Sequence, residues 1–228
     1  MPRPAVGILT RAPAPGRTKT RLARTIGAAA AVSLATAMLQ DAVEAVRAGP
    51  WRTVVFVEPG VAVDAVRSLT GHADALPQGE GDIGARMRAA AMALFDAGRG
   101  PVVLVGTDIP SLGAAQVAAA LDAVAAGSDV VFGPAADGGY YLLGLRRLRD
   151  DREGALFSPA IPWGGPGVLA QSEAAAASAG LRTARIETLR DIDTAADLAA
   201  LRLRIGAAGV AGPRTTAVVR TLGRGAGC

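Results

Sequence analysis

Short runs of β-branched and other apolar residues alternate along this chain with longer, alanine-rich segments, and this alternation is its most constraining feature. The segment PVVLVGTD at 101–108 has the continuous Val and Leu core of a strand buried on both faces. We therefore predict a three-layer α/β/α sandwich with a mostly parallel central sheet. The predicted strands are 5–11, 52–59, 101–108, 129–134, 140–145 and 182–186, and the predicted helices are 27–49, 82–98, 114–127, 167–179 and 194–205.

The alternating pattern ends near Ile205. A chain of 228 residues fits one large domain, and we place that domain over residues 1–205. Residues 206–228 are rich in Gly and carry Arg but no acidic residue, which indicates a flexible, disordered tail. Within it, TTAVVRTL at 215–222 is compatible with an added strand or a short helix.

Composition excludes several classes of protein. The net charge of +4 is modest for this length, and with 4% aromatic residues the chain lacks the stacking platform of a nucleic-acid binder, so we expect no nucleic acid polymer as partner. A small polyanionic ligand explains the basic balance equally well. One His and one Cys argue against a structural zinc site. We see no apolar run of about 20 residues and expect no membrane span; with a single Cys, a cytoplasmic location is expected.

The loop after the first predicted strand, RAPAPGRTKTRLA at 11–23, has the composition of a phosphate site. Ligands of open α/β sheets bind beyond the carboxyl ends of the strands, where this loop lies. Backbone N–H groups freed by glycine and a cluster of cations bind phosphate oxygens. The spacing matches neither the Walker loop nor GxGxxG. An idle basic surface loop is the alternative. The phosphate-binding residues expected here are Arg11, Gly16, Lys19 and Arg21.

Lys19 is the only lysine among the 24 basic residues. Lysine is a compact charge on a flexible stem, whereas arginine is a planar fork. A site that admits one cation into a narrow gap, or that follows a phosphate through a reaction, tolerates lysine and rejects arginine. We therefore also expect Lys19 to be catalytic, with survival by chance as the alternative.

Carboxylates follow the third predicted strand and precede the last predicted helix. Asp108 leaves the strand in GTDIPSL at the carboxyl edge of the sheet, where it is placed to hold Mg²⁺ together with substrate phosphates, and we expect it to be catalytic. Its alternative role is to cap a turn. Asp193 is available as a second metal carboxylate, while Thr194 and Asp197 have the spacing of a capping pair.

Two further segments supply candidate binding residues. In LPQGEGDIGARM at 76–87, the Gln78 side chain offers a donor and an acceptor to a base, and Asp82 and Gly84 line the same pocket, although Asp82 is equally explained as a helix N-cap. In GPAADGGYYLLGL at 133–145, glycines let the backbone approach a ligand or form a hairpin turn. From this segment and the later IPWGG we expect a catalytic Asp137 and substrate contacts from Gly138, Gly139, Tyr140 and Trp163, the last equally a core anchor.

Taken in order, RAPAPGRTKTRL, QGEGDIGARM, GTDIPSL, GPAADGGYYLLGL, LFSPAIPW and DIDTAADL resemble the DUF2064 family of the GT-A, or nucleotide-diphospho-sugar transferase, superfamily. The resemblance spans residues 4–205. The segment KTRLA and the later AMLQDAV are also similar to the 2-phospho-L-lactate guanylyltransferases, but DGGYY and IPW favour DUF2064. Arg11 stands where that family often has lysine.

The resemblance implies a GT-A-like domain that binds a nucleotide through Mg²⁺ or Mn²⁺. It implies metal ligation by Asp108 and Asp193, phosphate binding by Lys19 and Arg21, and base binding by the Gln78 loop. The implied activity is transfer of a sugar from a nucleotide sugar to a small acceptor. The alternative is nucleotidyl transfer from a nucleoside triphosphate to a phosphorylated metabolite, with release of pyrophosphate. A non-catalytic nucleotide-binding regulator is a third hypothesis, and the sequence does not indicate the oligomeric state.

Overall fold

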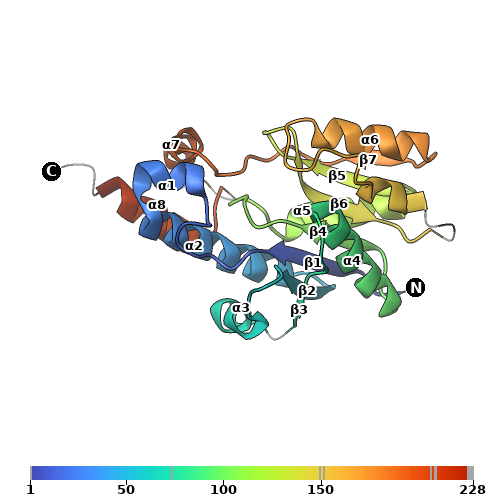
Figure 1. Cartoon of the computed structure of the whole chain (residues 1–228), viewed down its shortest axis with the longest axis horizontal. Helices are drawn as coiled ribbons and strands as arrows, with labels where there is room; N and C mark the ends of the chain where they lie inside the picture. The colour runs from blue at the N-terminus through green and yellow to red at the C-terminus, as the bar shows by residue number, and fades with distance from the viewer. Residues whose placement is uncertain are drawn as a thin grey trace.

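A seven-stranded sheet runs through the centre of the molecule (Figure 1). The computed structural model describes residues 2–224 except 73, 149, 151, 206, 208 and 209. The strand order is β3-β2-β1-β4-β6-β5-β7. All neighbouring strands are parallel except at β6, which is antiparallel to both β4 and β5. The strands are β1 (Ala5–Thr10), β2 (Arg52–Val57), β3 (Ala75–Pro77), β4 (Val102–Val105), β5 (Val130–Pro134), β6 (Tyr140–Leu145) and β7 (Thr183–Arg185).

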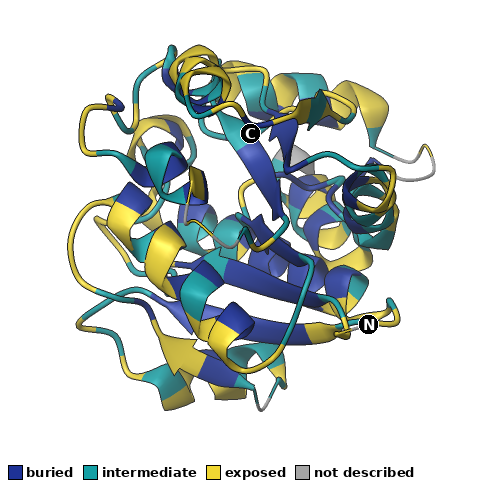
Figure 2. Cartoon of the chain, turned by 90° about the vertical axis from the view of Figure 1, so that its right-hand side faces the viewer, coloured by how far each residue is buried: buried dark blue, intermediate teal, exposed yellow. Residues whose placement is uncertain are grey.

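Helices cover both faces of the sheet, which confirms the predicted three-layer α/β/α sandwich. On one face α2 (Ala28–Arg47), α3 (Val63–Thr70) and α5 (Ala114–Ala125) pack on side chains of β1, β2 and β4. On the other face lie α4 (Ile83–Asp96), the 3₁₀ helix η1 (Arg152–Phe157) and α6 (Val168–Ser178). The central strands are buried on both sides (Figure 2), as their continuous Val and Leu runs predict.

A third hydrophobic cluster lies beyond the sheet, at the end of the molecule where α1, α2, α7 and α8 gather in Figure 1. The helix α2 has 20 residues and is therefore about 30 Å long. From Leu39 onward it packs on the sheet, whereas Leu34 and Met38 belong to this outer cluster. The other helices there are α1 (Thr20–Ile26), α7 (Ala195–Arg204) and α8 (Pro213–Arg224).

The predicted flexible tail is wrong over 213–224, where the chain forms α8, the short helix that TTAVVRTL allowed. Asp41 of α2 holds the start of this helix, because its carboxylate accepts hydrogen bonds from the backbone N–H groups of Arg214 (3.2 Å) and Thr215 (2.7 Å). Val219 is buried against α2 and α7. A carboxylate that caps a helix from 173 residues away leaves no signal in the local sequence. Residues 225–228 of the predicted tail lie outside the described residues.

Four elements were not predicted: α1, α3, β3 and η1. The helices α1 and α3 have seven and eight residues and β3 has three, so their hydrophobic patterns are too short to predict an element from the sequence. The predicted helix at 27–49 is α2, separated from α1 by Gly27, whose φ of +86° breaks the helix. The predicted Thr194–Asp197 capping pair is confirmed: each side chain accepts a hydrogen bond from the other residue's backbone N–H.

By length and composition α2 could cross a membrane, and among the described residues it is the one helix that passes this test. Half of its most apolar window is buried inside the fold. Leu39, Val43 and Val46 face the sheet, and Leu34 and Met38 face the outer cluster. These contacts account for its apolar composition, because the core helix of a globular protein passes the same test.

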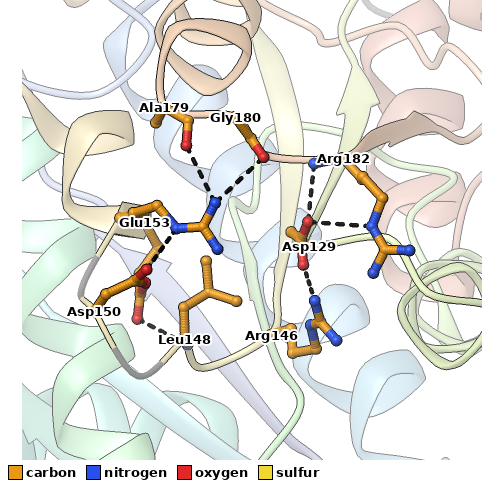
Figure 3. A network of polar contacts seen from close by, with 9 residues as sticks. Asp129, Arg146, Leu148, Asp150, Glu153, Ala179, Gly180 and Arg182 are labelled. Atoms are coloured by element: carbon orange, nitrogen blue, oxygen red, sulfur yellow. Dashed lines mark hydrogen bonds and ion pairs between the residues drawn. The ribbon is translucent and has the colours of Figure 1, made fainter.

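The amino edge of β5 and β7 is fastened by a network of ion pairs (Figure 3). Asp129, which precedes β5 and is only 4% exposed, accepts a hydrogen bond from the backbone N–H of Arg182 (2.9 Å). The guanidinium groups of Arg146 and Arg182 complete its shell. Nearby, Arg152 donates to Asp150 (2.8 Å). The contacts of Asp129 join the ends of β5, β6 and β7 at the edge of the sheet opposite to its carboxyl edge.

Candidate functional site

The strand order reverses direction at β1, because β2 lies on one side of it and β4 on the other. In open α/β sheets the loops after such strands separate and leave a crevice at the carboxyl edge. A pocket of about 560 Å³ lies at this point. Its walls come from the loop after β1, the residues after β2, β3 and β4, and the first turns of α1 and α4.

Lys19 lies at the base of this pocket, and its ammonium donates to three oxygens. The Nζ atom is 2.7 Å from Oδ1 of Asp108, 3.1 Å from Oδ1 of Asp193 and 2.6 Å from the carbonyl oxygen of Ile192. The Lys19 side chain is 3% exposed, whereas those of Asp108 and Asp193 are 66% and 43% exposed. The cation is therefore enclosed by protein, and the carboxylates face outward.

This geometry explains why the one lysine of the chain stands at this position. Three N–H donors of an ammonium match three converging oxygens, while a planar guanidinium is too broad for a gap of this kind. Lys19 also has a φ of +43°, and it is the only non-glycine residue with positive φ in the described part of the chain. Such a conformation costs about 1–2 kcal/mol. The three contacts hold the residue in it.

The two carboxylates set the protonation state of Lys19. Burial by itself would lower the pKa of the ammonium, but Asp108 and Asp193 offset burial and raise the pKa above its ordinary value. Lys19 is therefore charged at neutral pH. With its three N–H groups already used, a contact to phosphate, as predicted from the sequence, requires it to exchange one of these oxygens.

Asp108 and Asp193 are brought together by the backbone. The N–H of Ile192 donates to the carbonyl oxygen of Asp108 (3.1 Å), which ties the segment before α7 to the segment after β4. No group of three or more acidic, His or Cys side chains among the described residues could hold a metal on its own. Two exposed carboxylates fit Mg²⁺ or Mn²⁺ nonetheless, because Mg²⁺ is commonly bound by one or two carboxylates together with substrate phosphates.

Several basic side chains line the pocket, and an acidic residue after β2 holds two of them. Glu58, directly after β2, forms ion pairs with Nε of Arg11 (2.9 Å) and Nη2 of Arg17 (3.3 Å), which fixes the loop over the sheet edge. Arg21 of α1 and Arg86 of α4 line the same pocket. With Lys19, five cationic side chains line this pocket against the three carboxylates of Glu58, Asp108 and Asp193, a net charge of +2.

Gln78, directly after β3, is 8% exposed and lines the pocket. Its Nε2 donates to the carbonyl oxygens of Thr10 (3.1 Å) and Phe56 (2.9 Å). These two acceptors fix the orientation of the amide. Its Oε1 is buried and has no hydrogen-bond partner among the described residues. A buried acceptor is costly when unpaired, so Gln78 is suited to receive a hydrogen bond from a ligand.

The pocket brings together about half of the residues predicted from the sequence. Those that line it are Arg11, Lys19, Arg21, Gln78, Asp108, Tyr140 and Asp193. Tyr140 is largely enclosed, and burial raises its pKa to about 12. The predicted residues outside this lining are Gly16, Asp82, Gly84, Asp137, Gly138, Gly139 and Trp163.

Several of these outlying residues have structural contacts. Asp82 caps α4 by accepting from the N–H of Ala85 (2.8 Å), which is the alternative that the sequence left open. A Cβ on Gly84 would lie 2.5 Å from the ring of Trp163, so these two pack on each other. Their predicted roles in binding have no direct support from the pocket.

The turn before β6 is similarly accounted for. A Cβ on Gly138 would lie 2.0 Å from the carbonyl oxygen of Pro166, and its φ of +94° favours glycine. The N–H of Gly139 donates to Oδ1 of Asp137 (2.9 Å). Asp191 lies close to Asp137 and Asp193; burial first and then these two charges raise the pKa of its carboxyl.

Glu58 and Arg86 line the pocket but were not singled out in the sequence. Glu58 directly follows the strand β2, so its position at the carboxyl edge of the sheet could have identified it as a candidate site residue. Arg86 is one turn into α4, within the QGEGDIGARM segment, but it reaches the pocket only because α4 packs beside β1 and β4.

The fold is shared with several solved structures. A proposed nucleotide-diphospho-sugar transferase from Desulfovibrio desulfuricans G20 is 28% identical, with a TM-score of 0.88 over 98% of this chain and 96% of that one. A cytidylyltransferase from Leptospira borgpetersenii is 10% identical, with a TM-score of 0.58 over 98% and 95% of the two chains. Rv0371c from Mycobacterium tuberculosis, solved with manganese, is 18% identical, with a TM-score of 0.50 over 87% and 97%.

At 10% and 18% identity, the cytidylyltransferase and Rv0371c show only that the fold is shared. This fold is that of nucleotide-diphospho-sugar transferases. No curated protein sequence matches the chain significantly. The family described as "Uncharacterized protein conserved in bacteria (DUF2064)" matches residues 38–165, more than half of the sequence. On this match, and in agreement with the sequence motifs, the chain belongs to the DUF2064 family.

Proposed function

We propose that this protein is a metal-dependent transferase that acts on a nucleotide and moves a sugar from a nucleotide sugar to a small acceptor. The observation that carries the proposal is the meeting of two outward-facing carboxylates, Asp108 and Asp193, with a basic loop in one pocket at the strand-order reversal. The 28% identity, over nearly the whole chain, to a proposed nucleotide-diphospho-sugar transferase supports it.

Asp108 and Asp193 would hold the metal, Mg²⁺ or Mn²⁺, which supplies positive charge to the phosphates of the substrate when bound. Rv0371c, which was solved with manganese, has the same fold as this chain. In the free protein the ammonium of Lys19 donates to both carboxylates, at 2.7 Å and 3.1 Å.

Arg11, Arg17, Arg21 and Arg86 would stabilise the negative charge that develops on the leaving nucleoside diphosphate. In glycosyl transfer the bond between the anomeric carbon and the phosphate oxygen breaks. The acceptor oxygen bonds to that carbon and gives up its proton, and the diphosphate leaves with the bonding electrons. Arginine suits this role because its donors match phosphate oxygens in pairs.

Gln78 would contact the base. Because Nε2 is fixed by two backbone carbonyls, Oε1 is the group that it offers, and the base must present an N–H to it. Tyr140 would line the substrate side of the pocket. Asp137 stays a predicted base for the acceptor hydroxyl, with Gly16, Asp82, Gly84, Gly138, Gly139 and Trp163 as predicted contacts outside this pocket.

Nucleotidyl transfer is the second candidate, and the excess of cationic side chains favours it. A net charge of +2 on the side chains that line the pocket suits a triphosphate, which carries more negative charge than a nucleotide sugar. In this reaction an oxygen of a phosphorylated acceptor bonds to the α-phosphorus, and pyrophosphate leaves.

A thermal-shift panel and a product assay separate the two. A ligand at about 100 times its Kd adds about 2.7 kcal/mol of stability, which such a panel detects readily. With Mg²⁺ or Mn²⁺ present, we expect a nucleotide sugar to shift the unfolding temperature and, with an acceptor, to release a nucleoside diphosphate. A triphosphate-specific shift with release of pyrophosphate would establish the second candidate. No shift with any nucleotide, in the presence of either metal, would refute both.

We propose that a single domain carries this activity and that it comprises residues 1–205 with α8 packed against it. A small-molecule acceptor and a cytoplasmic location remain predictions from the sequence.

A further inference from the structure

The geometry points to a gating role for Lys19: in the free protein its ammonium acts as a counter-cation for Asp108 and Asp193 that keeps divalent metal out of the pocket and admits it only together with a polyphosphate. This inference rests on the proposed function, because it concerns the metal that Asp108 and Asp193 would hold. It adds a coupling between the binding of metal and of polyphosphate. It also makes Lys19 a competitor of the metal for the two carboxylates in the free protein, and no longer a phosphate-binding residue alone.

The first step of the argument is the charge of the two carboxylates. In the free protein one ammonium is shared between them at 2.7 and 3.1 Å, so the pair presents one negative charge instead of two. The attraction between a divalent cation and this pair falls accordingly. Lys19 is 3% exposed, so water does little to screen its charge from a metal at the same carboxylates.

The second step is the charge of the whole pocket. Four guanidinium groups and the ammonium outweigh three carboxylates, so an entering divalent metal meets a net positive lining. The diphosphate of a nucleotide sugar brings two negative charges and cancels that positive charge, and a free diphosphate or triphosphate brings three or more and reverses it. Metal and polyphosphate therefore strengthen each other's binding, and this coupling is the same in either order of addition.

The third step is the mobility that the contacts of Lys19 permit. Its partners are two carboxylate oxygens at an exposed edge and one carbonyl oxygen. When a metal takes the carboxylates, phosphate oxygens of the substrate can replace them as acceptors for the ammonium. The flexible lysine stem allows this exchange, which a rigid guanidinium would not.

The experiment measures binding of Mn²⁺ to the full chain by electron paramagnetic resonance of the free ion, without any nucleotide. For the unmodified protein we expect weak binding of Mn²⁺ alone. Inorganic pyrophosphate, a probe that needs no base, should tighten it by about tenfold or more, after allowance for the Mn²⁺–pyrophosphate complex in solution. In Lys19→Met, we expect Mn²⁺ alone to bind about tenfold tighter than in the unmodified protein, and pyrophosphate to add less.

Arg21→Met is the matched control, because it removes one positive charge from the same pocket at an exposed side chain. Its effect on the affinity for Mn²⁺ alone should stay below about threefold, since solvent screens exposed charges. Circular dichroism and urea unfolding test whether each variant is folded. The side chains of Asp108 and Asp193 are 66% and 43% exposed, so water can solvate both carboxylates once Lys19 is replaced.

Two results overturn the inference: tight binding of Mn²⁺ alone to the unmodified protein, or a folded Lys19→Met that binds Mn²⁺ no better than Arg21→Met. Neither result contradicts the proposed function, which requires only that nucleotide and metal bind. That proposal fails separately, if no nucleoside diphosphate, triphosphate or nucleotide sugar binds at all.

Discussion

Two ion-pair clusters at opposite edges of the sheet are built in opposite ways. At the amino edge the carboxylate of Asp129 is buried, and the arginines around it are 43% and 65% exposed (Figure 3). At the carboxyl edge the cation, Lys19, is buried, and its carboxylates are exposed. The first cluster satisfies a group that the fold has enclosed. The second turns carboxylate oxygens outward, where they can bind something else.

The difference shows how a structural ion pair can be told from a site. A buried carboxylate surrounded by donors has no capacity left for a ligand. Asp129 accepts from the backbone N–H of Arg182 and from two guanidinium groups. In contrast, Asp108 accepts a hydrogen bond from Lys19 through Oδ1, and its carboxylate lines the pocket.

The largest effect is expected from Asp108→Asn. An amide cannot supply the charge that holds a divalent metal, and since even outer-shell partners of a metal are worth about 10–100-fold, turnover should fall about a hundredfold or more. Stability should change little, because the side chain is 66% exposed. Turnover with the nucleotide substrate and urea unfolding check both parts. Unchanged turnover would remove Asp108 from the metal site.

Asp129→Ala should show the reverse pattern. The N–H of Arg182 and the guanidinium of Arg146 lose a buried acceptor, which we expect to lower the free energy of unfolding by about 1–3 kcal/mol. Turnover per folded molecule should stay the same, because the network lies at the far edge of the sheet. The comparison of the two edges breaks down if Asp129→Ala is fully stable but inactive.

The stabilising effect of Asp129 should depend on pH. Burial alone would raise its pKa, but the hydrogen bonds from Arg182 and Arg146 lower it below the ordinary value of 3.8. A carboxyl with a lowered native pKa stabilises the fold above its unfolded pKa, and the effect is lost as pH falls through the native pKa. Urea unfolding should therefore show Asp129→Asn less stable than the unmodified protein at pH 7, with the gap closing below about pH 4. A gap that persists in acid would assign the effect to packing.

Asp191→Asn should have the smallest effect, and its sign should be opposite. Burial and the charges of Asp137 and Asp193 raise the pKa of Asp191, so its ionised form is disfavoured in the native state. This penalty is present above the native pKa and disappears in acid. Removing the charge should raise the unfolding temperature at pH 7 by on the order of one or two degrees. Calorimetry at pH 7 and pH 3 measures it, and a lower unfolding temperature at pH 7 contradicts the repulsion.

The sequence by itself determined the layers of this fold. Short continuous Val and Leu runs are typical of strands buried on both faces, and the alanine-rich segments between them fit helices on both faces of a sheet. The α/β/α sandwich could therefore be predicted from local patterns. The same holds for the basic loop and for Asp108, because each directly follows a strand and must lie at the carboxyl edge.

Only the tertiary structure decided how these groups meet. Asp193 is 85 residues from Asp108, and the backbone pairing of Ile192 with Asp108 that joins them depends on how α7 packs on α1. Three other features likewise depend on contacts between distant segments: the burial of Lys19, the capping of α8 by Asp41 and the position of Arg86 in the pocket. Side-chain chemistry and strand position are local properties, whereas burial and charge pairing are set by whichever segment packs against them, and no local pattern encodes that neighbour.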